Sequence, residues 1–315
     1  MNDGVTAADA EIRENPELAH TLSLLAAHHG EVVVEHYYRQ AGPEDLHDIH
    51  SVTKSVVSTL VGMLVGDGLV ALDTPVCSLV EAPAAFTADP AKTAITVQHL
   101  LTMTSGLDPR RQWDIDEITA RGEPAVEGAL RAPLIAAPGQ FFVYNNGATH
   151  VLSAVVEAVA GKPMAAFAAE RLFAPLDIQR WEWPIDPEGR HWGNGHLRLA
   201  PADLLKLGTL HLKGGRWNGV QVLPEAYVGL ATTPSTSGGR PELCSYGLLW
   251  WITDPPARPM AFAAGHGGQY VVVVPDLDLV VLTTTDVDAV ARPLGLPLRR
   301  VIMETIVPAF ATSPS

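Results

Sequence analysis

The sequence predicts an α+β fold in which strands from both ends of the chain form one antiparallel sheet. Three observations lead to this prediction. Runs rich in β-branched residues occur near the N-terminus and again in the last third of the chain. The long part between them has the apolar spacing of helices. Tight turns connect neighbouring strands, so the terminal strands are expected to pair antiparallel, with the helical middle as an insertion beside the sheet.

The N-terminal part is expected to supply two strands. Residues 5–20 are acidic and rich in alanine, and they predict a short helix or a loose arm. Residues 22–27 and 31–38 predict strands joined by a turn at His29-Gly30. The polar loop over residues 40–50 contains His47 and His50 around Asp48. Their spacing leaves a metal site open as an alternative, with little support.

A buried helix is predicted to start at Ser51 and to stop at Gly66-Asp67-Gly68. Apolar residues recur every four positions in two rows, so most of the helix surface is expected to be buried. Ser51 and Lys54 lie three apart and share one face of the first turn. A hydroxyl at the positive end of a helix with an amine in reach is suited to form a nucleophile. The alternative for this pair alone is an N-cap serine beside a solvated lysine.

The middle of the chain predicts mainly helices. Residues 108–140 are rich in proline, arginine and aspartate and predict a loop with short helices. Residues 140–147 predict a brief apolar run that ends in a polar turn. A short helix closed by Gly106 is expected over residues 96–106, and further helices over residues 148–160, 163–172 and 201–212.

The last third predicts most of the sheet. A hairpin signature at residues 275–278 connects two of its strands. A terminal amphipathic helix is expected over residues 293–310. The predicted strands cover residues 246–253, 259–264, 269–274 and 279–285.

Composition excludes some functions. The chain has 315 residues, of which 47% are hydrophobic, and a formal charge of −14. That charge argues against nucleic acid or an anionic membrane as a partner.

No run is long enough to span a bilayer, and the N-terminus lacks the pattern of a secretory signal, so a cytoplasmic location is expected by default. Cys77 and Cys244 predict free thiols. Nothing indicates an oligomeric state.

Three motifs follow one another along the chain: Ser51-x-x-Lys54, Tyr144-x-Asn146 and His266-Gly267-Gly268. In this order the chain resembles the serine β-lactamase and penicillin-binding-protein superfamily, specifically its class C β-lactamase and esterase branch. Residues 100–107 and 195–208 also look like that branch, so the resemblance covers roughly residues 20 to 310.

The resemblance implies a β-lactamase-like (DD-peptidase) fold with the site in a cleft between two parts of a single catalytic unit, residues 1–315. The sheet part would comprise residues 20–65 and 205–315, and the helical part residues 66–204. Neither a metal nor another cofactor is implied, and no metal- or nucleotide-binding motif is present.

The resemblance also implies roles for the motif residues. Ser51 would attack an acyl carbonyl, with Lys54 and Tyr144 moving the proton and Tyr144 as the general base. A free tyrosine titrates at about 10, so the Lys54 ammonium would have to lower the pKa of Tyr144. Asn146 would orient Lys54 or the substrate amide. An oxyanion hole would combine the Ser51 N–H with one from residues 265–269. Which N–H from His266 to Gln269 faces the oxyanion stays open, and His266, Gly268 and Gln269 are named as candidate binding residues.

The third motif departs from the Lys-Thr-Gly of β-lactamases, because His266 stands at the lysine position and the following loop is short. This removes a fixed positive charge that would pair with a substrate carboxylate. The expected partner is a small ester or amide, including linear amides such as those cut by the 6-aminohexanoate-dimer hydrolases of the superfamily. Four tryptophans are candidates for the wall of an acyl pocket, with ordinary packing as the equal alternative: Trp113, Trp181, Trp183 and Trp192.

Three other functions remain open from the sequence. An acyltransferase or transpeptidase would share the Ser51 acylation but use an alcohol or amine as acceptor. A β-lactamase or D,D-peptidase would act on the same scaffold. A catalytically silent, ligand-binding member of the superfamily is the non-enzyme alternative.

Overall fold

The computed structural model describes residues 3–255, 257–290 and 295–311. Its centre is an eight-stranded antiparallel sheet in the order β2-β1-β13-β12-β11-β10-β9-β8. The N-terminal strand β1 lies between β2 and the C-terminal strand β13, with Leu25 opposite Leu282, which confirms the predicted pairing of the two ends. The strands are β1 (Thr21–His28), β2 (Glu31–Tyr37), β8 (Thr236–Gly239), β9 (Cys244–Tyr246), β10 (Trp251–Ile252), β11 (Ala261–Gly265), β12 (Gln269–Val274) and β13 (Leu279–Thr285).

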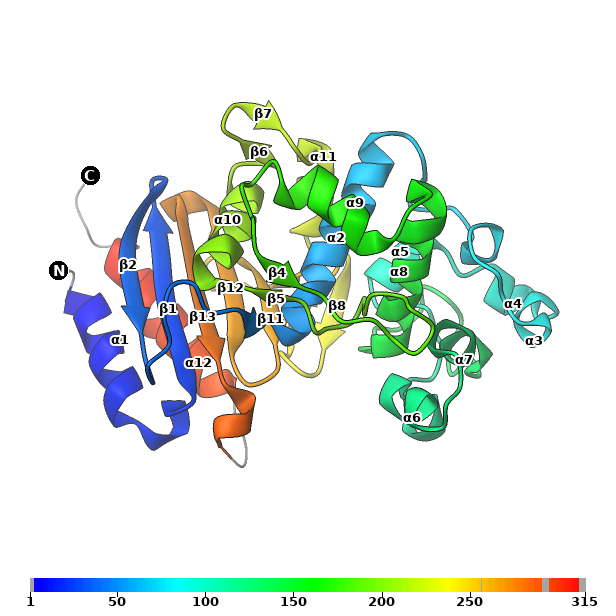
Figure 1. Cartoon of the computed structure of the whole chain (residues 1–315), viewed down its shortest axis with the longest axis horizontal. Coiled ribbons are helices and arrows are strands. Elements are labelled where there is room, and N and C mark those ends of the chain that lie inside the picture. Colours follow the sequence, from blue (N-terminus) through cyan, green and yellow to red (C-terminus); the bar gives the residue numbers. More distant parts are fainter. Residues whose placement is uncertain (1–2, 256, 291–294, 312–315) are drawn as a thin grey trace.

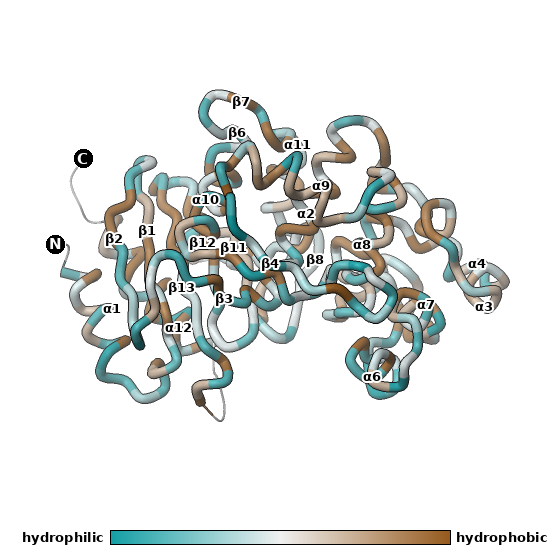
Figure 2. The backbone as a smooth tube through the Cα atoms, in the orientation of Figure 1, coloured by the Kyte–Doolittle hydropathy of each residue, from teal (hydrophilic) through white to brown (hydrophobic). Residues whose placement is uncertain are grey.

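Helices lie on both faces of the sheet and at one end of it. The helices α1 (Asp3–Glu14) and α10 (Pro201–Leu212) pack near the terminal strands, while α2 (Thr53–Gly66) separates the sheet from the other helices (Figure 1). In Figure 2 the tube is brown along parts of the central strands and of α2, which mark the hydrophobic core. The helices on the side of α2 away from the sheet form the helical group. They are α3 (Ala84–Thr87), α4 (Pro90–Thr93), α5 (Val97–Leu101), α6 (Ile115–Ala120), α7 (Ala125–Arg131), α8 (Asn146–Ala160) and α9 (Met164–Ala168). The predicted bounds of the two parts of the chain stay a prediction.

Most helices agree with the sequence pattern. The helix predicted over 163–172 continues from α9 into a π-helical segment, Ala169–Phe173. The helix predicted over 96–106 is shorter, because Thr96 caps α5 and Leu101 ends it. The terminal helix is divided into α12 (Leu296–Arg300), a π-helical segment Val301–Ile306 and α13 (Val307–Ala311), while residues 293–294 lie outside the described residues.

The predicted strand over residues 246–253 is wrong, because the chain folds back there as a tight hairpin between β9 and β10. Gly247 N–H donates to the Trp250 carbonyl at 2.9 Å, and Leu249 has a φ of 60°. The tip is fixed to α2, since the hydroxyls of Ser55 and Ser58 each donate to a carbonyl of the tip at 2.7 Å. Tertiary contacts with α2 therefore decide a conformation that the apolar run alone does not reveal.

Smaller elements were not predicted. Strands β3 (His47–Asp48), β5 (Arg198–Leu199) and β4 (Trp181–Glu182) form a sheet that joins the approach to Ser51 to the helical part. A hairpin of β6 (Arg216–Trp217) and β7 (Val220–Gln221) precedes α11 (Glu225–Ala231).

Cys77 and Cys244 are free thiols, as predicted. Across the described part of the chain, no single helix has the length and apolarity needed to cross a membrane; α8 with residues 164–173 passes that test only as a bent pair.

The contact of α10 with the sheet gives the first prediction. A Cβ on Gly208 would lie 2.6 Å from a methyl of Val280 and 2.7 Å from one of Val271. Gly208→Ala is therefore expected to destabilise the protein by about 1–3 kcal/mol, since overpacking outweighs the better helix propensity of alanine. A Cβ on Gly229 in α11 would have nothing within 4 Å, so Gly229→Ala is the matched control. Thermal melts should show a lower midpoint for Gly208→Ala only; equal midpoints would contradict this packing.

Candidate active site

Ser51 lies at the start of the central helix, in a short 3₁₀ turn, His50–Val52, directly before α2. Lys54 Nζ is 2.8 Å from Ser51 Oγ, so the two side chains meet as their spacing predicts. The turn is held from outside, because Asp48 Oδ1 accepts the His50 N–H at 2.7 Å while His50 has a φ of 46°. A left-handed histidine before the serine is a strained conformation that its surroundings must maintain.

The Lys54 amine is buried without a carboxylate partner among the described residues. The residue is 2% exposed, and its Nζ donates to the Asn194 carbonyl at 2.6 Å as well as to Ser51. Burial lowers the pKa of Lys54 to about 7, and the more distant charge of Asp116 only partly opposes this. Near neutral pH a large fraction of the amine is therefore unprotonated and able to accept a proton. The contact that orients the amine comes from the Asn194 carbonyl. The alternative role predicted for Asn146, orienting the substrate amide, stays a prediction.

Tyr144 lies across the site from the nucleophile. Its ring stacks on Trp251 at 6.0 Å between centroids, and Lys54 Nζ is 5.0 Å from the ring centre. Burial raises the pKa of Tyr144 above its ordinary value, and contact with Ser51 only partly opposes this. The expectation that the Lys54 ammonium lowers the pKa of Tyr144 is therefore wrong: the downward shift falls on Lys54, and Tyr144 stays a phenol at neutral pH.

The residues after Tyr144 begin a helix and do not form the predicted turn. The Asn145 side chain caps α8 by accepting the Ala148 N–H at 2.9 Å, and it donates to the Leu107 carbonyl at 3.0 Å. Asn146 is the first residue of α8 and lines the cavity over Ser51. Its Oδ1 is buried without a hydrogen-bond partner among the described residues. The capped helix end thus fixes Tyr144 and Asn146 together.

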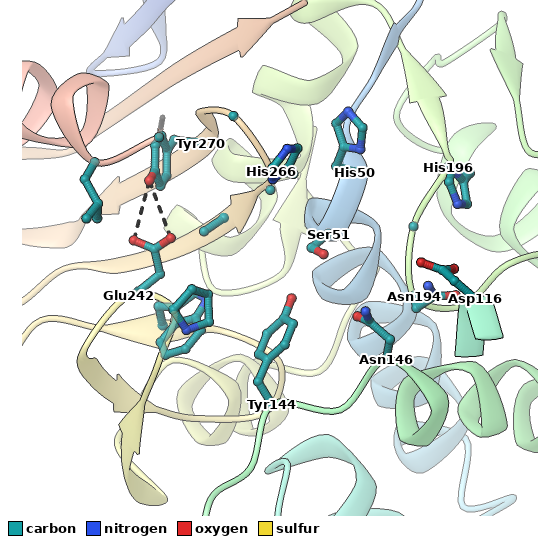
Figure 3. Close-up of a pocket in the computed structure, with 18 residues that line it drawn as sticks. His50, Ser51, Asp116, Tyr144, Asn146, Asn194, His196, Glu242, His266 and Tyr270 are labelled. Carbon is teal, nitrogen blue, oxygen red and sulfur yellow. Dashed lines mark hydrogen bonds between the residues drawn. The ribbon is translucent and has the colours of Figure 1, made fainter. Parts of the chain in front are cut away.

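The third motif forms the turn between β11 and β12. His266 lines the cavity near Ser51 (Figure 3). Gly268 and Gln269 do not line it, which corrects their predicted place in the site. The Gly268 N–H donates to the Gly265 carbonyl at 3.3 Å, and the Gln269 side chain bonds the backbone and hydroxyl of Thr285. These two residues hold the turn from behind.

The cavity that these residues surround has a volume of about 570 Å³. Asp116 and Glu242 add carboxylates to its wall, and none of the described residues that line it is a lysine or arginine. Trp251, Tyr144 and Tyr270 form its aromatic wall, and none of the four tryptophans predicted for this role lines it. Trp183, for example, is buried and donates to the Trp192 carbonyl at 2.8 Å.

Two parts of the site could not be recognised from the sequence. Asn194 contributes a backbone carbonyl, which leaves no trace in residue type. His196 lines the cavity with its Nδ1 3.4 Å from Asp48, and this contact raises the pKa of His196. His47 instead bonds the Thr284 hydroxyl at 2.7 Å, away from His50. Within residues 3–255, 257–290 and 295–311, no three His, Cys, Asp or Glu side chains are grouped to hold a metal ion.

A family model described as Beta-lactamase matches residues 9–301. The chain belongs to this family. It is 26% identical over 296 residues to the 6-aminohexanoate-dimer hydrolase of Paenarthrobacter ureafaciens, covering 86% of this chain and 74% of that protein. It is 32% identical over 183 residues to Esterase EstB of Burkholderia gladioli, covering 49% of this chain and 45% of the esterase. The family and these relatives make the protein a hydrolytic enzyme, as the motifs predicted.

Solved structures confirm the β-lactamase-like fold of this family member. A putative 6-aminohexanoate-dimer hydrolase from Bacillus anthracis superposes with a TM-score of 0.80 at 19% identity, covering 95% of this chain and 81% of that one. EstCE1, described as a hydrolase with promiscuous acyltransferase activity, gives a TM-score of 0.77 at 18% identity and covers 98% of both chains. The fold is thus retained at low sequence identity.

The buried amine of Lys54 gives the second prediction. Its pKa in the folded protein, about 7, lies below the ordinary value of 10.5. Between these values the unfolded chain binds a proton that the folded protein lacks, so Lys54 makes stability rise with pH by up to about 1.4 kcal/mol per unit. Lys54→Met should remove this contribution. Denaturant melts from about pH 7 to pH 9.5 should show a smaller rise for the variant, since this window lies between the two pKa values. Equal slopes would contradict the low pKa.

Proposed function

We propose that the protein is a serine hydrolase that acts on small esters or linear amides through an acyl-enzyme on Ser51. The contact of 2.8 Å between the Lys54 amine and the Ser51 hydroxyl carries this proposal, because the pKa of about 7 makes that amine a base at neutral pH. The catalytic residues are Ser51, Lys54 and Tyr144.

Acylation would proceed by proton transfer within this group. The neutral Lys54 amine accepts the Ser51 proton as Oγ bonds to the substrate carbonyl carbon. When the bond to the leaving group breaks, the Tyr144 hydroxyl donates a proton to it and regains one from the Lys54 ammonium. Water then attacks the acyl carbonyl and gives a proton to Lys54. As the ester bond breaks, the Lys54 ammonium returns that proton to Ser51 Oγ, which restores the serine hydroxyl and the neutral amine. The raised pKa of Tyr144 supports its role as the acid in this cycle.

The oxyanion hole would combine the N–H groups of Ser51 and His266. Gly265 pairs with Gln269 across a three-residue loop, so their backbone groups point at each other. His266 is the first residue of the turn after β11 and lines the cavity, so its N–H is the candidate donor on this side. The pairing of β10 with β11 reaches only Phe262, so this edge is open toward the cavity. One such donor is worth about 10²–10³ in rate.

The cavity wall supports neutral or cationic substrates over carboxylates. Asp116 and Glu242 line it, and the described lining residues include no lysine or arginine. Glu242 is paired with Arg299 at 2.6 Å behind the wall, so Asp116 is the carboxylate of the wall that has no ion pair among the described residues. A β-lactam or a peptidoglycan stem peptide carries a carboxylate that would find no fixed positive partner among them. The names of two relatives, an amide hydrolase and an esterase, support small amides and esters as the reacting class. They do not bear on the charge preference, because a linear 6-aminohexanoate dimer carries both an ammonium and a carboxylate.

The acyl-enzyme gives the third prediction. With p-nitrophenyl acetate and butyrate we expect turnover and a mass increase of the protein by one acyl group. Ser51→Ala should lose both, because no other hydroxyl is bonded to Lys54 in the described site. Intact-protein mass spectrometry and nitrophenol release are the measurements, with nitrocefin as the competing substrate. Faster opening of nitrocefin would reassign the enzyme to β-lactams. Added alcohols that change the product without changing the acylation rate would indicate acyl transfer.

The protonation of Lys54 gives the fourth prediction. Only the neutral amine accepts the serine proton, so kcat/KM should fall about tenfold per pH unit below an apparent pKa near 7 and level off above it. Because burial raises the pKa of Tyr144 from its ordinary value of 10.0, no second loss is expected below that pH. His196→Gln is the control for a cavity histidine whose pKa is raised by its contact with Asp48. The fall of kcat/KM below about pH 7 is the acid limb of the pH profile. If this limb disappears in His196→Gln but remains with ester substrates in Lys54→Arg, the base is a residue other than Lys54.

A further inference from the structure

Outside the cavity, two fully buried ionisable side chains lie against each other. His150 is in the first half of α8, and Asp186 is in the loop that follows β4. Both side chains have no exposed surface, and His150 Nε2 is 3.0 Å from Asp186 Oδ2. Neither residue lines the cavity over Ser51. Burying such a pair is costly unless each hydrogen bond is satisfied, so its contacts need an explanation.

The remaining contacts of the pair determine how it is protonated. His150 Nδ1 accepts the Gly193 N–H at 3.2 Å, which requires the proton of a neutral ring to lie on Nε2 and to be donated to Asp186. The other oxygen of Asp186 accepts the backbone N–H groups of Glu188 and Arg190 at 2.9 and 2.8 Å. The pair thus fastens the loop over residues 186–193 to the side of α8.

The fastened loop continues directly into the contact with the catalytic amine. Gly193 sits so close to α8 that a Cβ would lie 2.6 Å from the Thr149 carbonyl. The next residue, Asn194, presents its carbonyl to Lys54 Nζ at 2.6 Å, and Nζ contacts Ser51 Oγ at 2.8 Å. Hydrogen bonds and one stretch of backbone therefore connect Asp186 through His150, Gly193 and Asn194 to the nucleophile.

We propose that His150 and Asp186 are positioning residues that hold the Asn194 carbonyl, and through it the Lys54 amine, in place for proton transfer from Ser51. The inference rests on the proposed function of Ser51 and Lys54 and extends it to a pair that touches no substrate. A lysine side chain is flexible, and no described carboxylate lies within hydrogen-bond reach of Lys54 to fix its end. The backbone carbonyl supplies a directional acceptor without adding a negative charge that would raise the pKa of the amine.

The experiment replaces Asp186 by asparagine. In Asp186→Asn the new side-chain oxygen can still accept the two loop N–H groups, but the amide NH₂ then faces His150 Nε2. The imidazole must move its proton to Nδ1, where it opposes the Gly193 N–H. We expect kcat for p-nitrophenyl esters to fall roughly 10–100-fold with KM little changed, as for a misplacement remote from the chemistry. The acid limb of kcat/KM should also move to lower pH, because the ammonium form of Lys54 loses an acceptor.

Two further variants separate positioning from general loosening. Glu157→Gln removes the ion pair between Glu157 and Arg190, which belongs to the same loop but does not lead to Lys54, and it should keep both kcat and the limb. His150→Asn places an amide oxygen near the position of Nδ1, so the double variant Asp186→Asn/His150→Asn should recover activity relative to Asp186→Asn. Thermal melts establish that each variant is folded at the assay temperature.

The outcomes distinguish a failure of the positioning role of His150 and Asp186 from a failure of the proposed function of Ser51. Unchanged kcat in Asp186→Asn, a fall with an unmoved limb, or an equal fall in Glu157→Gln would overturn the positioning role. If Ser51→Ala still forms the acyl adduct, the proposed function itself fails, whatever the Asp186 variants do. Both proposals would be supported if Ser51→Ala forms no acyl adduct, if Asp186→Asn has a lower kcat with a shifted acid limb, and if the double variant recovers activity.

Discussion

The site depends on an amine that is buried where no described carboxylate neutralises it. An ammonium in this position would lose its hydration, and no negative group would replace the lost interactions. Burial therefore lowers the pKa of Lys54 and favours the neutral base. Ser51 Oγ and the Asn194 carbonyl are the acceptors that remain, and both are uncharged. The same burial raises the pKa of Tyr144, which stays protonated. One desolvated site thus separates a base from an acid without a charged partner for either.

The surrounding architecture maintains this burial. The helix α2 carries the amine between the sheet and the helical group, and its polar side chains fasten the hairpin of β9 and β10. That hairpin places Trp251 against Tyr144. The turn after β11 is held from behind by His20, whose Nε2 is 2.7 Å from the Gly267 carbonyl, and by the side chain of Gln269. The sides of the cavity formed by Ser51, Trp251 and His266 are therefore attached to the central helix or to strands of the sheet, while Asn146 belongs to α8 on the opposite side.

The sequence predicted those features that local pattern controls. The strands at the two ends of the chain, the helices α8 and α10, and the meeting of Ser51 with Lys54 followed from periodicity, caps and spacing. What it did not predict depends on contacts between distant segments. The hairpin at Gly247 has the composition of a continuous strand, and the carbonyl of Asn194 acts through the backbone. The direction of the Tyr144 pKa shift also required the structure, because it follows from burial and not from the nearest charge in the motif.

The choice of a carbonyl in place of a carboxylate has a consequence for charge and geometry. A carboxylate in the position of the Asn194 carbonyl, 2.6 Å from Lys54 Nζ, would stabilise the ammonium and raise its pKa, which would remove the base at neutral pH. A carbonyl leaves the base available but gives a weaker restraint, so its own position must be fixed by other contacts. The close approach of Gly193 to α8 and the buried pair of His150 and Asp186 supply those contacts. The Asp186 carboxylate thus lies behind the backbone of residues 193–194 and not in contact with Lys54. From there it orients the Asn194 carbonyl through His150 without forming an ion pair with the amine.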